Sequence, residues 1–243
     1  MNSTRNTLIE EATDVCSACR THGIEVRIFG SVGAAIVGEL WFKLHPKRKR
    51  ELKDIDLVGE KSTLNDVRRI LCDRGFREVV RVAIETEGDR AIFGNDTVLI
   101  DFSTDELRFA QKLPILDRLT VSFPTLSATD LILEKLQIVS PKPAQIIDFL
   151  AVLCSTGTAN LEFDYLQQIL GRRWSYWHSA SRFLVDAKAF ATSENLLDEL
   201  SEIDQLVDVN RNLPKTMEWN MRSWFGSVLP WHNVVEAISE DRI

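Results

Sequence analysis

Two aspartates separated by one residue are the first candidates for chemistry in this sequence. Asp54 and Asp56 lie in the run Asp54-Ile55-Asp56-Leu57-Val58, whose residue types are typical of a strand. Because side chains alternate between the two faces of a strand, we expect both carboxylates on one face and Ile55 on the other. Neighbouring carboxylates repel each other, and a divalent cation between them removes that repulsion. The alternative is a solvated pair at a sheet edge.

A third carboxylate, Asp101, is the only acid in the apolar strand-like run 98–102. A buried carboxylate without a partner costs free energy, so Asp101 requires a partner. If its strand lies beside that of Asp54, three carboxylates converge. Such a set can hold two Mg²⁺ ions for an in-line displacement at phosphorus. We therefore predict that Asp54, Asp56 and Asp101 form a catalytic, metal-binding set.

The dipeptide Gly30-Ser31 is the candidate anion site. It follows the alternating run 24–29, and the small residues from Gly33 onward suit a helix packed closely on that strand. A glycine allows the backbone to approach a ligand closely. Amides at the start of a helix bind anions, so Gly30 and Ser31 are predicted to bind a phosphate.

The order of these motifs resembles a known group of enzymes. Gly30-Ser31 after a strand, then Asp54-x-Asp56, then Asp101 on a later strand are similar to the three-part signature of the DNA polymerase β-like nucleotidyltransferase superfamily. The resemblance implies that Gly30 and Ser31 bind a triphosphate and that Asp54 and Asp56 bind metal. It further implies that Asp101 completes the metal site and takes the proton from the acceptor hydroxyl.

Motifs in the second half of the chain resemble one branch of this superfamily. Segment 126–137 and the later run 146–150 resemble the branch that contains the AbiEii-type abortive-infection toxins and many uncharacterised bacterial relatives. The resemblance covers residues 26–153 and is vaguer beyond them. The stretch 32–53 between the first two motifs is longer than is usual in the superfamily.

Four further residues are predicted to contact the nucleotide. The resemblance implies that Lys135 reaches a phosphate and that Asp148 places this lysine or the nucleobase. Arg50 and Lys53 directly precede the acids and would stabilise charge on the transferring phosphate. The alternatives are a surface position for Lys135 and a solvated loop for the basic run 47–50.

These features predict a Mg²⁺-dependent nucleotidyltransferase, with Mn²⁺ as a substitute metal. It would move a nucleoside monophosphate from an NTP to an acceptor hydroxyl and release pyrophosphate. The acceptor stays open among a tRNA end, a protein side chain and a small molecule such as an aminoglycoside. Two other functions also stay open. One is a catalytically silent binding module of a toxin–antitoxin system, and the other is a phosphotransferase that uses the same cleft.

The elements that must position these residues divide the chain near Leu113. The first half combines strands and helices, and the second half is helical in pattern. The strands are predicted over 24–29, 54–58, 79–84, 91–93 and 98–102. We therefore expect an α+β fold. A nucleotidyltransferase-type mixed sheet with flanking helices would occupy residues 1–113, and a helical domain completing the cleft would occupy residues 114–243.

Helix and loop boundaries follow from local signals. Thr63 with Asp66, and Ser127 with Asp130, have the spacing of a capping box at a helix start. Residues 40–53, with Pro46 and the basic run, read as a loop or irregular insertion.

Composition limits the remaining functions. No stretch approaches the roughly 18 apolar residues of a membrane span, and the N-terminus lacks an apolar signal core, so a cytoplasmic protein is expected. The net charge of −7 disfavours broad nucleic-acid binding.

Cys16-x-x-Cys19 has no second pair to complete a zinc site, and a structural role is predicted for it. The late tryptophans are predicted in core or interface positions rather than in base stacking.

Overall fold

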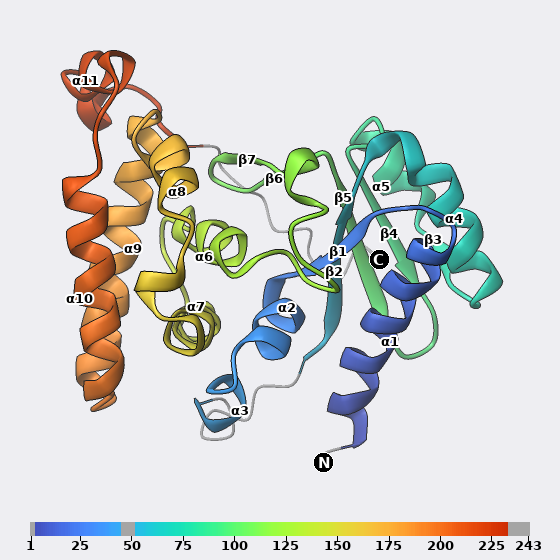
Figure 1. The fold of residues 1–243 in the computed structure, drawn as a ribbon. Coiled ribbons are helices and arrows are strands. Elements are labelled where there is room, and N and C mark those ends of the chain that lie inside the picture. Colours follow the sequence, from blue (N-terminus) through green and yellow to red (C-terminus); the bar gives the residue numbers. More distant parts are fainter. Residues whose placement is uncertain (1–2, 45–51, 233–243) are drawn as a thin grey trace.

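The computed structural model describes residues 3–44 and 52–232, and a five-stranded mixed sheet lies at the centre of the first half (Figure 1). The sheet has the order β1-β2-β5-β4-β3. β2 and β5 are parallel, whereas the other neighbouring pairs are antiparallel. The strands are β1 (Val26–Phe29), β2 (Asp54–Gly59), β3 (Arg77–Glu78), β4 (Arg90–Gly94) and β5 (Leu99–Thr104). The predicted α+β class with a mixed sheet is confirmed.

Helices lie on both sides of this sheet (Figure 1). On one side are α1 (Ser3–Thr21) and α4 (Leu64–Asp73). On the other side are α2 (Gly30–Val37), α6 (Ala128–Leu136) and α7 (Pro143–Thr156). The buried residues of α4 recur at the spacing of one helix face, which is why this polar segment forms a helix against the sheet.

The second half is helical, as predicted. A small hairpin of β6 (Glu106–Arg108) and β7 (Lys112–Pro114) and the turn η3 (Leu116–Arg118) lead into it. Beyond α6 and α7 come η4 (Thr158–Asn160), α8 (Phe163–Leu170), α9 (Trp174–Ser193), α10 (Leu197–Asn212) and α11 (Met217–Ser223). The sequence did not indicate α11.

The start of α6 is hydrogen-bonded to the outer edge of the sheet. The amide of Ile28 on β1 donates to Pro124 O at 3.0 Å, and the amide of Leu126 donates back to Ile28 O at 3.0 Å. The helix then begins after Ser127, whose hydroxyl accepts a hydrogen bond from the Asp130 amide. The predicted cap at Ser127 is confirmed, and these contacts fix α6 relative to the end of β1.

One predicted strand is wrong. Residues 79–84 form α5 (Val80–Glu85), a short helix with Val82 buried and with Val80 and Ile84 exposed. The apolar alternation would have placed all three on one strand face. The chain leaves the sheet at Val79, whose amide makes a last hydrogen bond to β4, and then turns into the helix.

Two other local predictions also need correction. Thr63 does not cap α4 with its side chain, because it lies in a 3₁₀ turn with helical φ and ψ and its hydroxyl donates to Glu60 O. The predicted loop 40–53 contains a short helix, α3 (Trp41–Leu44). Residues 45–51, with Arg50 and the basic run, lie outside the described residues.

The cysteine pair lies in the core. Cys16 and Cys19 are both fully buried on α1, and burial raises the pKa of Cys19 to about 11. Such thiols are unreactive at neutral pH, which supports their predicted structural role. Cys72, by contrast, is exposed.

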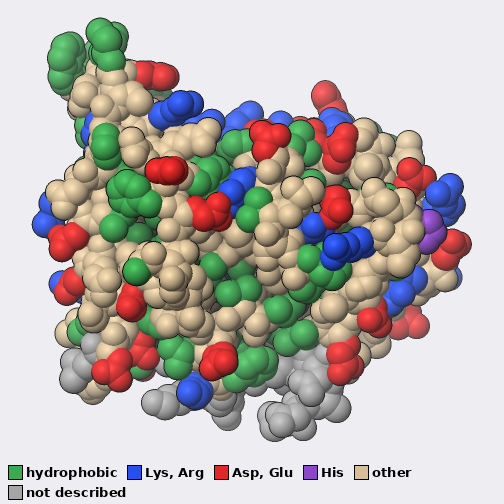
Figure 2. Space-filling view, in the orientation of Figure 1, with side chains coloured by type: hydrophobic (Ala, Val, Ile, Leu, Met, Phe, Trp, Pro, Cys, Tyr) green, Lys and Arg blue, Asp and Glu red, His purple; other side chains and the backbone are tan. Residues whose placement is uncertain are grey.

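The surface carries an apolar tip on the segment of α11 and η5 (Gly226–Val228). Trp224 is 82% exposed and Val228 is 89% exposed. Figure 2 shows hydrophobic side chains protruding at the upper left, where Figure 1 places α11. Trp224 is therefore not a core residue of the described chain, whereas Trp174 is buried. No helix among the described residues combines the length and apolarity needed to cross a membrane.

Candidate active site

The three predicted acids lie on one face of two neighbouring strands. In the parallel pair of β2 and β5, Asp56 is the direct partner of Asp101, and Asp54 precedes Asp56 by two residues. Direct partners in a sheet face the same side, as do residues two apart on a strand. The condition set by the sequence, that the strand of Asp101 lies beside that of Asp54, is met.

The Gly30 turn contacts the central acid of this set. Gly30 has a φ of +64°, a conformation that side chains disfavour. A Cβ at this position would lie 1.9 Å from Asp56 Oδ2 and 2.7 Å from its Cγ. Both the backbone angle and the contact therefore require glycine here. The predicted anion site and the predicted metal site are direct neighbours.

Asp56 lies among several other negative charges. Burial raises its pKa well above the usual range, and the nearby carboxylates of Asp54, Asp101 and Glu134 raise it further. Lys135 acts in the opposite direction. A cation close to Asp56 would relieve this repulsion.

Lys135 is a buried residue, so its interpretation as a surface lysine is wrong. Its Nζ lies 3.1 Å from Glu134 Oε1 and 3.4 Å from Asp148 Oδ2. Burial by itself lowers the pKa of this lysine, but the two carboxylates outweigh burial and hold the pKa above its ordinary value. Lys135 is therefore a fixed positive charge beside the acid set.

Asp148 connects the helical half to the Gly30-Ser31 turn. It is fully buried on α7. The Ser31 hydroxyl donates to its Oδ2 at 2.7 Å, and Trp41 Nε1 donates to its Oδ1 at 2.8 Å. The structure thus brings Ser31, Lys135 and Asp148 together. Trp41 joins them without any signal in the sequence.

Glu134 lies near the start of α2. The nearby backbone N–H of Gly30 lowers the pKa of Glu134, against a larger rise caused by burial. Among the described residues, Glu134 Oε2 has no hydrogen-bond partner. An internal carboxylate therefore lies near the helix end where a phosphate was predicted.

Asp101 has a partner that the sequence did not indicate. Arg90, on β4, donates from Nε to Asp101 Oδ1 at 2.8 Å and to Oδ2 at 3.1 Å, and its Nη2 also donates to Oδ2. The partner of this partly buried acid is thus a guanidinium. A two-point arginine–carboxylate pair is among the stronger polar contacts in proteins.

The acid set fits a divalent cation in part. Carboxylate oxygens are the ligands that Mg²⁺ prefers, and Asp54 and Asp56 present them on one face beside the space that Gly30 leaves. Within the described residues, no group of three or more His, Cys, Asp or Glu side chains is arranged to hold a metal ion. Arg90 would compete with a metal ion for the oxygens of Asp101.

Lys53 and Arg50 are the two predicted phosphate contacts that precede β2. Lys53 is exposed and directly precedes β2. Arg50 lies outside the described residues.

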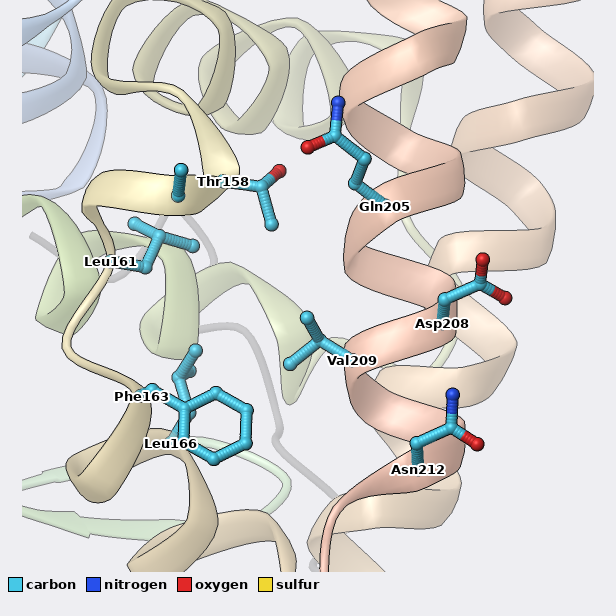
Figure 3. A pocket seen from close by; sticks show the side chains of 9 residues that line it. Thr158, Leu161, Phe163, Leu166, Gln205, Asp208, Val209 and Asn212 are labelled. Carbon is cyan, nitrogen blue, oxygen red and sulfur yellow. The ribbon is translucent and has the colours of Figure 1, made fainter.

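Two pockets lined by described residues lie away from the candidate site. One, of about 490 Å³, lies between η4, α8 and α10. Figure 3 shows Leu161 and Phe163 on one side and Gln205 and Asp208 on the other. The other, of about 870 Å³, lies beside Arg118. Of the described residues predicted for the site, none lines either pocket. The candidate site is therefore identified by its acids and not by cavity size.

Comparisons with known proteins add little to this geometry. No protein-family model matches the chain, and no curated protein matches it. Among solved structures, it is similar to the solution structure of the antibiotic-resistance factor ANT(2'')-Ia. The TM-score is 0.41 and the sequence identity is 12%, over 65% of this chain and 89% of that chain. A similarity this distant carries no argument about function, and the AbiEii-type branch stays a prediction.

Proposed function

We propose that this chain is a Mg²⁺-dependent nucleotidyltransferase that moves a nucleoside monophosphate from an NTP to an acceptor hydroxyl and releases pyrophosphate. The observation that carries the proposal is the position of Asp56. It shares a face with Asp54 and Asp101 and touches the glycine turn at the start of α2. Converging acids beside an anion-binding helix end are the parts that a displacement at phosphorus requires.

Asp54 and Asp56 would hold the metal ion. Bound Mg²⁺ neutralises negative charge on the reacting phosphates, and Mn²⁺ can substitute for it. The Gly30 amide and the N-terminal end of α2 would bind a phosphate. The nearby Glu134 carboxylate would have to move away, because it repels the phosphate. Ser31 would add a hydroxyl donor.

Lys135 and Asp148 have distinct tasks in this proposal. Lys135 is held charged between Glu134 and Asp148, so it would attract the triphosphate to this side of the acid set. Asp148 would orient both Lys135 and Ser31, because it contacts both. Catalysis would then depend on position and charge, without a covalent intermediate.

Asp101 would accept the proton of the acceptor hydroxyl. Its two oxygens are both bound by Arg90 in the described conformation. Each of these hydrogen bonds uses a lone pair of the carboxylate that an incoming proton could use. Movement of Arg90 away from Asp101 would therefore favour the proposed role. Arg50 and Lys53 would stabilise charge on the transferring phosphate from the segment before β2.

A catalytically silent binding module is the second candidate. The specific observation in its favour is the internal pairing of the site. Lys135 pairs with Glu134 and Asp148, Asp148 also binds Ser31, and Arg90 binds Asp101. A site whose charged groups are already paired is stable without substrate.

The proposal is tested by the double substitution Asp54→Ala/Asp56→Ala. The protein is incubated with each α-labelled NTP and a cell extract, and pyrophosphate, NDP and label on RNA, protein or small molecules are measured. We expect the double variant to fold and to lose all NTP turnover, since the substitutions remove the proposed metal ligands. The control is Asp66→Ala/Asp208→Ala, which removes two exposed acids on helices.

Each outcome has a clear meaning. Full activity in Asp54→Ala/Asp56→Ala shows that the site assignment is wrong. Release of NDP in place of pyrophosphate identifies a phosphotransferase. If the unaltered protein neither binds nor consumes any NTP in the presence of Mg²⁺, the silent binding module is correct. The position of the label identifies the acceptor class.

A further inference from the structure

The backbone places Arg90 within reach of the acid set. In the antiparallel pair of β4 and β5, Arg90 is opposite Ser103 and Ile92 is opposite Asp101. Arg90 is therefore diagonal to Asp101 on the same face, a separation that a long side chain spans. The start of β4 is fixed by Thr86, whose hydroxyl donates to Arg90 O at 2.8 Å and accepts from Arg90 N at 3.2 Å.

The side chain of Arg90 faces all three acids. Its hydrogen bonds to Asp101 raise its pKa, and the charges of Asp56 and Asp54 raise it further. The side chain of Arg90 is 36% exposed and that of Asp101 is 18% exposed. The guanidinium thus borders solvent on one side and the acids on the other, and it can leave Asp101 without disturbing the core.

A guanidinium and a divalent cation are competitors at Asp101. Both are attracted by the same carboxylate oxygens. They repel each other, and at distances of a few ångströms outside bulk water this repulsion amounts to several kcal/mol. Occupation of Asp54 and Asp56 by a dication therefore weakens the hold of Arg90 on Asp101.

We propose that Arg90 is a positioning residue, whose guanidinium is the counter-ion of Asp101 until a divalent cation binds at Asp54 and Asp56 and displaces it. Asp101 then becomes available to complete the acid set. This inference rests on the proposed function for the identity of the cation. It adds a residue that no sequence motif indicates.

The proposal has a measurable consequence for metal affinity. The cation competes with Arg90 for Asp101, so its apparent affinity for the complete acid set is the intrinsic affinity multiplied by the fraction of molecules in which the contact is open. Removal of Arg90 should therefore strengthen metal binding in the absence of nucleotide. A residue with a purely structural role would leave this affinity unchanged or weaken it.

The test is Mn²⁺ binding to the full-length protein without nucleotide, followed by the paramagnetic signal of free Mn²⁺. We expect Arg90→Gln to bind Mn²⁺ about tenfold more tightly than the unaltered protein. Arg90→Lys keeps the charge but loses the two-point hydrogen bond. It should bind Mn²⁺ with intermediate affinity, which separates competition for Asp101 from a general change in charge. Addition of Asp101→Asn to Arg90→Gln should abolish the gain.

The matched control is Arg68→Gln. Arg68 Nε donates to both oxygens of Glu78 at 2.9 Å, so the same substitution breaks an equivalent pair away from the acids. It should leave Mn²⁺ affinity unchanged. Circular dichroism and thermal unfolding establish that Arg90→Gln and Arg90→Lys are folded.

Two results overturn the inference. In the first, both Arg90 variants bind Mn²⁺ no more tightly than the unaltered protein does. In the second, no variant binds Mn²⁺. Tighter binding without NTP turnover in the unaltered protein supports the inference and rejects the proposed function. If the unaltered protein turns over NTP but the Arg90 variants show no change in Mn²⁺ affinity, the proposed function is supported and the inference about Arg90 is rejected.

Discussion

At the scale of single residues, two glycines with the same backbone angle differ in what surrounds them. Gly30 has a φ of +64° and Gly23 a φ of +74°. A Cβ at Gly23 would meet nothing within 4 Å, whereas a Cβ at Gly30 would overlap the Asp56 carboxylate. A side chain at Gly23 would therefore cost only the free energy of the unfavourable backbone angle. A side chain at Gly30 would cost this and the free energy of the overlap with Asp56.

This difference gives a stability prediction. Gly23→Ala should lower the free energy of unfolding by about 1–2 kcal/mol, the cost of a left-handed angle. Gly30→Ala should lower it by more, because the added methyl group must push Asp56 away. Urea unfolding of both variants measures the difference.

The double variant Gly30→Ala/Asp56→Ala decides whether the contact is the cause. Without the Asp56 carboxylate, most of the excess cost of Gly30→Ala should disappear. An excess that persists in the Asp56→Ala background would show that Gly30 does not touch the acid.

At the scale of elements, Arg118 joins η3 to α6 and α8. Its Nε donates to Asp130 Oδ1 at 3.1 Å, and its Nη1 donates to Glu162 Oε2 at 2.7 Å. Its guanidinium also lies 4.1 Å from the centre of the Tyr165 ring. Asp130 is fully buried, so this arginine neutralises a charge at the first turn of the helix that carries Lys135.

Arg118→Met should therefore be strongly destabilising. The loss of one partner of a buried ion pair leaves an uncompensated charge and costs about 3–5 kcal/mol. Arg69→Met is the control, because its pair with Asp66 is exposed and should contribute less than about 1 kcal/mol. Urea unfolding measures both. Equal effects of the two substitutions would contradict a central role for Arg118.

The effect of Arg118→Met should also depend on pH. Burial raises the pKa of Asp130 even with Arg118 present, and without Arg118 the pKa must rise further. An acid whose pKa is higher in the folded state destabilises the fold as pH rises above its unfolded value, about 3.9. The difference in unfolding free energy between the variant and the unaltered protein should therefore shrink as pH falls toward 4. A difference independent of pH would mean that Asp130 is not the residue left unpaired.

At the scale of the whole molecule, the two halves share one hydrophobic core. Buried residues from Leu8 to Leu213 belong to a single cluster. The contact is close where α2 ends, because a Cβ on Gly38 would lie 2.6 Å from the backbone carbonyl carbon of Ala151 on α7. The buried residues of the two predicted domains, 1–113 and 114–243, thus belong to one cluster, and the division near Leu113 stays a prediction.

This arrangement predicts a single cooperative unfolding transition. All tryptophans except Trp41 lie in the helical half, so fluorescence follows mainly that half, whereas circular dichroism follows both. The two signals should give the same midpoint in urea. Gly38→Ala should lower both midpoints together, because it forces α2 and α7 apart. Two separate transitions would show that residues 1–113 and 114–243 are independent domains.

Local rules explain what the sequence predicted correctly. The period of two along a strand places Asp54 and Asp56 on one face, and that follows from any strand containing them. Hydrophobic spacing predicts the helices, and the Ser127 cap needs only its own neighbours. The same local rules misassign 79–84, because a short apolar alternation does not reveal where a chain leaves its sheet.

The sequence by itself determined the types of chemistry that this protein offers: two acids on one strand face, a third on a later strand, and a glycine turn before a helix. Only the tertiary structure decided their partners. Arg90 pairs with Asp101, Lys135 pairs with Asp148, and Trp41 and Ser31 both donate to Asp148, so each contact joins residues from different elements. The physical reason is that a buried charge requires a counter-charge or donor but does not specify which one. The pairing of strands and the packing of α6 and α7 make that choice.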